Sequence, residues 1–150
     1  MTRCASCLLV APPLAGLLAG CGTQHPTTSE LQAVPGATSS YPGSAAVRGH
    51  GAHEGEHTLV DSSGAVLFST YCTDASRSEL TRWFASELDR DGWADEANPV
   101  GTTNSDVVAT QEWHRGQRHF TLQLLSPAYV GRLGAARGES CSTGYRSVVQ

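Results

Sequence analysis

The sequence predicts an α+β domain in which one main amphipathic helix packs on an antiparallel sheet of four or five strands. Two patterns carry this prediction: a helix signal over residues 76–92, and several short stretches in which apolar and polar residues alternate. The third observation is a pair of cysteines, Cys72 and Cys141, within the same region. We expect this domain to span residues 58–150.

Residues 1–20 have the properties of a secretory leader, with a basic start at Arg3, an apolar run and small residues at its end. The sequence Leu18-Ala19-Gly20-Cys21 resembles the lipobox of bacterial lipoprotein precursors. The resemblance implies cleavage before Cys21, a diacylglycerol on its thiol and an acyl chain such as palmitate on its amino group. Because several acyl chains anchor a protein stably, we expect attachment to the outer face of the cell membrane.

Two alternatives to the lipobox remain open, a plain secretory peptide and a membrane span. A span needs about 20 apolar residues. The apolar run in this leader is shorter, and Pro12-Pro13 interrupts it.

Residues 21–57 are rich in Thr, Ser, Pro, Gly and Ala and contain few large apolar side chains. Such a segment buries too little apolar surface to offset the entropy that it loses on ordering. We therefore expect a disordered tether that holds the folded domain away from the bilayer.

The end of this segment has three histidines and two glutamates between His50 and His57. Imidazole nitrogens bind zinc, copper and nickel, and carboxylates complete such sites. His50, His53 and His57 are therefore candidate ligands for Zn²⁺, Cu²⁺ or Ni²⁺, and no other cofactor is predicted. Their order does not match the helical HExxH pattern of metalloproteases, and the alternative is a solvated linker.

The folded region is expected to open with a turn at residues 61–64 between two short strands. The second strand, residues 65–73, places Val66, Phe68 and Cys72 on one face.

The clearest predicted element is the helix that follows, because Ser76 and Glu79 have the spacing of a capping box. Asp91-Gly92 ends it, and Trp93 is expected to fold back over its end. The apolar stripe at helical spacing consists of Leu80, Trp83, Phe84 and Leu88.

Residues 106–114 and 117–126 predict two strands of a hairpin with a turn at Arg115-Gly116. A short helix from Pro127 to Ala136 and a last strand over 145–149 are expected to follow. The apolar faces of the hairpin are predicted to be Phe120, Leu122 and Leu124 on one strand and Val107, Ala109 and Trp113 on the other.

Four cationic or titratable residues surround the predicted turn: His114, Arg115, Arg118 and His119. Arginine donates to carboxylate or phosphate in a bidentate way, which makes an anionic ligand conceivable. We favour the alternative of an ordinary strand edge whose charges discourage pairing with other sheets.

The cysteines favour a disulfide between Cys72 and Cys141. Cys4 and Cys7 leave with the leader and Cys21 is the lipidation site, so one pair remains. Outside the cytoplasm such a pair is typically oxidised. The alternative is two buried free thiols.

Charge and motifs exclude several function classes. Loss of Arg3 leaves nine basic and fourteen acidic residues, a net charge of −5, which argues against nucleic acid and anionic lipid as binding partners. The sequence has no GxSxG elbow, glycine-rich phosphate loop or calcium loop. We therefore expect a protein that is not an enzyme.

The stretch from Tyr71 to Trp93, with its capped helix ending in Gly92-Trp93, resembles small actinobacterial lipoproteins of uncharacterised function. The resemblance implies a strand, a capped helix and a hairpin, together with a membrane address, and it transfers no catalytic residues. We expect a membrane-anchored extracytoplasmic module that binds a small ligand or another envelope protein. The alternative is an envelope metal-binding protein that uses His50, His53 and His57.

Overall fold

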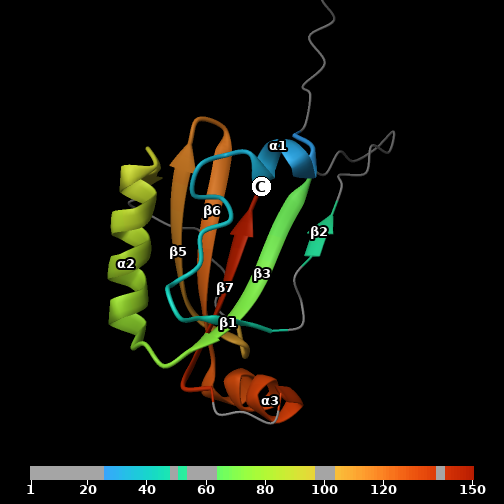
Figure 1. Ribbon diagram of the computed structural model, residues 1–150, viewed down its shortest axis with the longest axis vertical. Helices are drawn as coiled ribbons and strands as arrows, with labels where there is room; N and C mark the ends of the chain where they lie inside the picture. The colour runs from blue at the N-terminus through green and yellow to red at the C-terminus, as the bar shows by residue number, and fades with distance from the viewer. Residues whose placement is uncertain (1–25, 48–50, 54–63, 97–103, 138–140) are drawn as a thin grey trace, which may run out of the picture.

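A seven-stranded antiparallel sheet forms the centre of the described chain (Figure 1). The computed structural model describes residues 26–47, 51–53, 64–96, 104–137 and 141–150, with the backbone alone for 51–53 and 134–137. The strand order is β1-β3-β7-β6-β5-β4, and β2 also pairs with β3. The strands are β1 (Ala45–Ala46), β2 (Gly51–His53), β3 (Val66–Thr73), β4 (Ala94–Asp95), β5 (Val107–Arg115), β6 (Arg118–Leu125) and β7 (Thr143–Val149).

The α+β class is confirmed, but the expected numbers of strands and helices are wrong. The four long strands, β3, β5, β6 and β7, cover the predicted positions, whereas β1, β2 and β4 have only two or three residues each. Strands this short leave no alternation pattern to detect. The main helix is accompanied by α1 (Thr28–Gln32), which was not predicted, and by α3 (Pro127–Arg137), which matches the short helix predicted from Pro127 to Ala136.

The main helix, α2 (Arg77–Arg90), begins and ends as its sequence predicts. The Ser76 side chain accepts a hydrogen bond from the Glu79 amide, and the Glu79 side chain accepts from the Ser76 amide. At the other end Gly92 has a φ of +81°, a value that favours glycine. The Trp93 amide then donates to the Leu88 carbonyl, which turns the indole back over the helix end.

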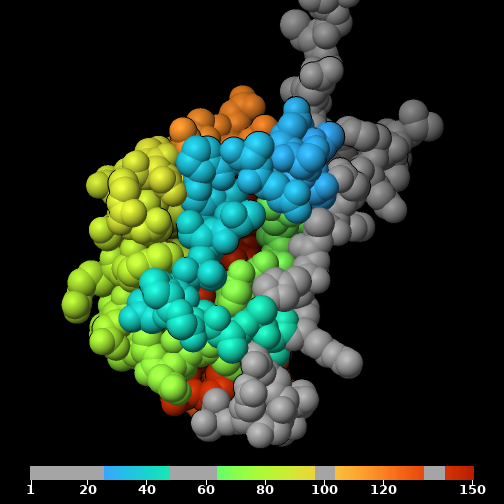
Figure 2. Space-filling model, in the orientation of Figure 1, coloured from blue at the N-terminus to red at the C-terminus, as the bar shows by residue number. Residues whose placement is uncertain are grey.

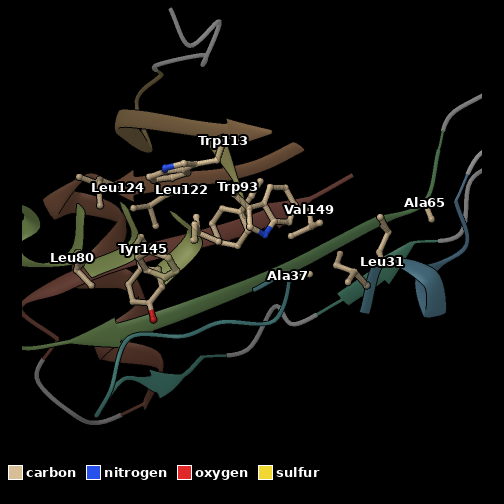
Figure 3. Packing of buried hydrophobic residues seen from close by; sticks show 14 residues of the cluster. Leu31, Ala37, Ala65, Leu80, Trp93, Trp113, Leu122, Leu124, Tyr145 and Val149 are labelled. Atoms are coloured by element: carbon tan, nitrogen blue, oxygen red, sulfur yellow. The ribbon is translucent and has the colours of Figure 1, made fainter. Parts of the chain in front are cut away.

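The main core lies between α2 and one face of the sheet, which we call the inner face (Figure 3). Leu80, Phe84 and Leu88 of α2 are fully buried there. Trp83 is only partly buried, and its ring lies beside those of Tyr41 and Phe84. The sheet contributes Leu67, Trp113, Phe120, Leu122, Leu124, Tyr145 and Val149.

Residues 26–47, predicted as part of a disordered tether, are folded instead. Leu31 in α1 is fully buried, and Ala37 and Val47 are nearly so. This segment runs across the inner face beside α2, as the blue to cyan surface of Figure 2 shows. The backbone of β2 within 51–53 is also paired with the sheet. The remainder of the predicted tether lies outside the described residues.

Long-range hydrogen bonds explain why so few apolar residues are enough to order this segment. The Trp93 indole Nε1 donates to the Pro35 carbonyl at 2.7 Å. The Tyr145 hydroxyl accepts from the Tyr41 amide and donates to Ser44 Oγ, each at 2.9 Å. Burial raises the pKa of the Tyr145 hydroxyl to about 12. These side-chain partners, Trp93 and Tyr145, are thus 58 or more positions away along the chain.

The hairpin differs from the prediction in its turn and in one face. Its turn is Gly116-Gln117, one residue later than predicted, and Gly116 has a φ of +64°. The bulge between Val107 and Ala109 shifts the register of β5 against β6. Val107 therefore pairs with Leu125, and its side chain lies on the opposite face of the sheet from that of Ala109.

Helix α3 covers one end of the opposite face of the sheet, which we call the outer face. Val130 of α3 packs with Val107 and Leu125 in a second hydrophobic cluster. Gly144 of β7 permits this approach, because a Cβ atom there would lie 2.8 Å from Val130 Cγ2.

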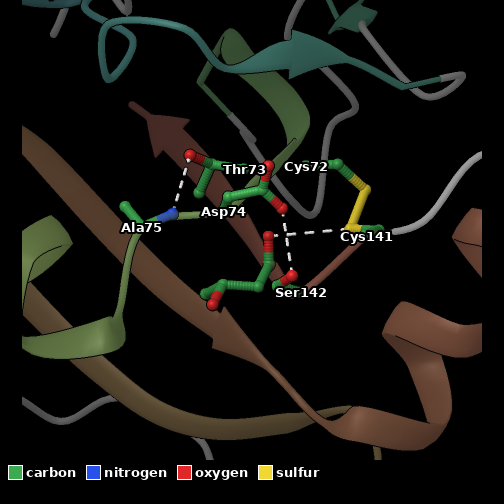
Figure 4. Close-up of a disulfide and its surroundings, with 7 residues drawn as sticks. Cys72, Thr73, Asp74, Ala75, Cys141 and Ser142 are labelled. Atoms are coloured by element: carbon green, nitrogen blue, oxygen red, sulfur yellow. Dashed lines mark hydrogen bonds between the residues drawn. A yellow bond between two sulfur atoms is a disulfide. The ribbon is translucent and has the colours of Figure 1, made fainter.

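The disulfide between Cys72 and Cys141 is confirmed, with the Cα atoms 5.4 Å apart (Figure 4). It joins β3 to the segment that leads into β7. Beside it the Ser142 hydroxyl donates to Asp74 at 3.0 Å, which adds a second link between the same two segments.

Candidate functional site

Three of the predicted site residues lie outside the described chain: Cys21, His50 and His57. The backbone of His53 lies in β2, paired with Val66. Across the described residues, no group of three or more His, Cys, Asp or Glu side chains is placed to hold a metal ion. The metal hypothesis for the histidine segment therefore stays a prediction.

If His50, His53 and His57 chelate an ion, a calorimetric titration of the mature protein with Zn²⁺, Cu²⁺ or Ni²⁺ should show binding that weakens below about pH 6.5, because only neutral imidazole coordinates. His53→Ala should weaken binding much more than the control His25→Ala. Equal affinity for the wild type and a variant with all three histidines replaced by alanine would reject the metal site.

The hairpin cluster does not form a single cationic patch. His114 pairs with His119 and Arg115 with Arg118, so strand alternation places the two pairs on opposite faces of the sheet. His114 Nδ1 lies 3.4 Å from Glu96 Oε2, an exposed contact. The two arginines and the two histidines therefore lie on opposite faces of the sheet and cannot contact one ligand together. This arrangement disfavours the hypothesis that the four residues bind an anionic ligand.

The outer face away from α3 carries apolar side chains that no described segment buries fully. Phe68, Val148, Thr121 and Glu112 pair successively across β3, β7, β6 and β5 and form one row. Phe68 and Val148 are half-buried, and in the described part of the chain they belong to neither hydrophobic cluster. Within the described residues, this row therefore combines apolar and polar side chains.

A second row on the outer face contains Arg146, which the sequence patterns did not indicate as a site residue. Its guanidinium donates to Thr70 Oγ1 at 3.3 Å and to the Tyr129 hydroxyl at 2.9 Å. It also lies 5.7 Å from the centre of the Tyr129 ring, and no described carboxylate forms an ion pair with it. The only signal in the sequence is one arginine within the alternating stretch 145–149.

The pKa shifts resolved in the described chain have structural causes. Hydrogen bonds from Thr27 lower the pKa of Glu30, and hydrogen bonds from Ser76 lower the pKa of Glu79, since both carboxylates belong to helix caps. Structural hydrogen bonds also perturb pKa values, so these two shifts do not point to a functional site.

Comparison with protein-family models, curated proteins and solved structures finds no significant match for this chain. Within the described residues, no helix has the length and apolar character needed to cross a membrane.

Proposed function

We propose that the protein is a lipid-anchored, extracytoplasmic module of the cell envelope that binds a partner without catalysing a reaction. The observation that carries the address is the Cys72–Cys141 disulfide, because disulfides persist in oxidising compartments outside the cytoplasm. The lipobox-like sequence that ends at Cys21 supplies the anchor in this proposal.

The outer face supports the binding part of the proposal. The half-buried side chains of Phe68 and Val148 lie beside Thr121 and Glu112 on a regular sheet surface. Interfaces between proteins combine such apolar groups with a polar surround. The partner is a second envelope protein, which such a surface favours, or a small ligand.

Replacement Cys21→Ser is expected to abolish lipid attachment, because it removes the thiol that forms the thioether. The wild-type protein should enter the detergent phase on temperature-induced partitioning, and the variant should stay in the aqueous phase. Globomycin, which blocks the lipoprotein signal peptidase, should leave the wild type as an unprocessed precursor. A wild-type protein that partitions into water and is unaffected by globomycin would refute the anchor.

A further inference from the structure

The folded domain starts close to the proposed lipid attachment site. Only residues 22–25 separate Cys21 from Pro26, the first described residue, and α1 begins at Thr28. A fully extended chain from Cys21 to Pro26 spans at most about 18 Å. A flexible tether over the whole of 21–57 would have a root-mean-square length of about 35 Å. On the same root-mean-square scale, five residues span about 12 Å, so the folding of residues 26–47 shortens the reach of the anchor to roughly a third.

The position of α1 determines which end of the domain lies near the anchor. Figure 1 shows α1 at the same end of the sheet as the β5–β6 turn and the C-terminus. The charge of Arg118 contributes to the lowered pKa of Glu30, which agrees with this proximity. The amide of His119 donates to the Gln150 carbonyl at 2.8 Å, so the turn and the C-terminus are also neighbours.

We infer that this end of the domain, formed by α1, the β5–β6 turn and the C-terminus, faces the phospholipid headgroups. The inference rests on the proposed lipidation of Cys21. The orientation follows from the short chain between Cys21 and Pro26 and from the position of α1, where the folded part begins. The opposite end, with α3 and the disulfide, points away from the membrane.

The chemistry of the membrane-facing end indicates contact at headgroup level without insertion. Among the described residues, the exposed large apolar side chain is Val108, which lies near the start of β5 at the opposite end. Arg118 lies near Glu30, so the charges at this end are mixed. The anchor, rather than electrostatic attraction, therefore holds the domain against the lipid surface.

Site-specific fluorescence quenching by nitroxide lipids tests the orientation. In the mature lipidated protein Cys21 is alkylated and Cys72 and Cys141 are bridged, so one added cysteine is the only free thiol. Gln117→Cys places a fluorophore at the β5–β6 turn, and Ala128→Cys places it on α3. Both residues are exposed, and strand β6 and its flanks separate them by about 30 Å. Vesicles of phosphatidylcholine with a headgroup nitroxide serve as the membrane.

The label at position 117 should be quenched several-fold more than the label at position 128. Nitroxides placed deep in the acyl chains should quench neither. A flexible Gly/Ser insertion of about 20 residues after Gly22 should remove the difference between the two positions. Protein that floats with the vesicles but shows equal quenching at both positions would overturn the orientation while leaving the anchor intact. Protein that does not float, and whose Cys21 carries no lipid by mass spectrometry, would overturn both.

Discussion

Replacement of Phe84 by alanine is expected to lower the free energy of unfolding by about 3–5 kcal/mol. The side chain is fully buried at the centre of the main core. Its ring centroid lies 5.7 Å from that of Phe120 and 5.5 Å from that of Tyr145, so truncation leaves a cavity between α2 and two strands. Urea denaturation of the mature chain, followed by tryptophan fluorescence, measures the loss.

Two variants provide controls for this experiment. Phe68→Ala removes the same ring from the outer face, where the side chain is half-buried, and should cost clearly less. Ser86→Ala changes an exposed position of α2 and should be nearly neutral. A loss for Phe84→Ala no larger than for Phe68→Ala would show that α2 does not cover the inner face.

Removal of the disulfide is expected to have an effect of similar size. The bridge closes a loop with a sequence separation of 69 residues. The chain-entropy relation assigns about 4 kcal/mol to a crosslink of this span, because the bridge restricts the unfolded chain. Cys72→Ala combined with Cys141→Ala should therefore lower the urea midpoint strongly, as should dithiothreitol added to the wild type.

The double variant also serves as the control for the reductant. Dithiothreitol should leave its midpoint unchanged, because no bridge is left to reduce. If the oxidised wild type, the reduced wild type and the double variant unfold at the same urea concentration, the bridge contributes nothing to stability and the expectation fails.

Local signals were sufficient to predict the elements with strong patterns. Ser76, Glu79 and Gly92 specify the ends of α2 through contacts within a few residues, and the structure reproduces them. The alternation of Phe120, Leu122 and Leu124 likewise identifies a strand with one buried face. The hairpin turn was misplaced by one residue, because the pattern does not distinguish Arg115-Gly116 from Gly116-Gln117.

The candidate surface was harder to predict, because burial depends on segments that are distant in the sequence. Val66, Phe68 and Cys72 share one face of β3, as predicted. Tyr71, the neighbour of Cys72, pairs with the core residue Tyr145 and lies on the inner face, so these three side chains lie on the opposite face. That face is the outer one, which α2 does not cover. The partners of Arg146 come from two distant parts of the chain, because β3 supplies Thr70 and α3 supplies Tyr129.

The sequence by itself determined the helix α2, the long strands, the pairing of Cys72 with Cys141 and the proposal of an anchor at Cys21. The tertiary structure alone decided that residues 26–47 belong to the domain and that Phe68 faces outward. Composition describes how much apolar surface a segment carries, and residues 26–47 carry little. Their order comes from fully buried Leu31 and from hydrogen bonds to Trp93 and Tyr145, which exist only after the core has assembled.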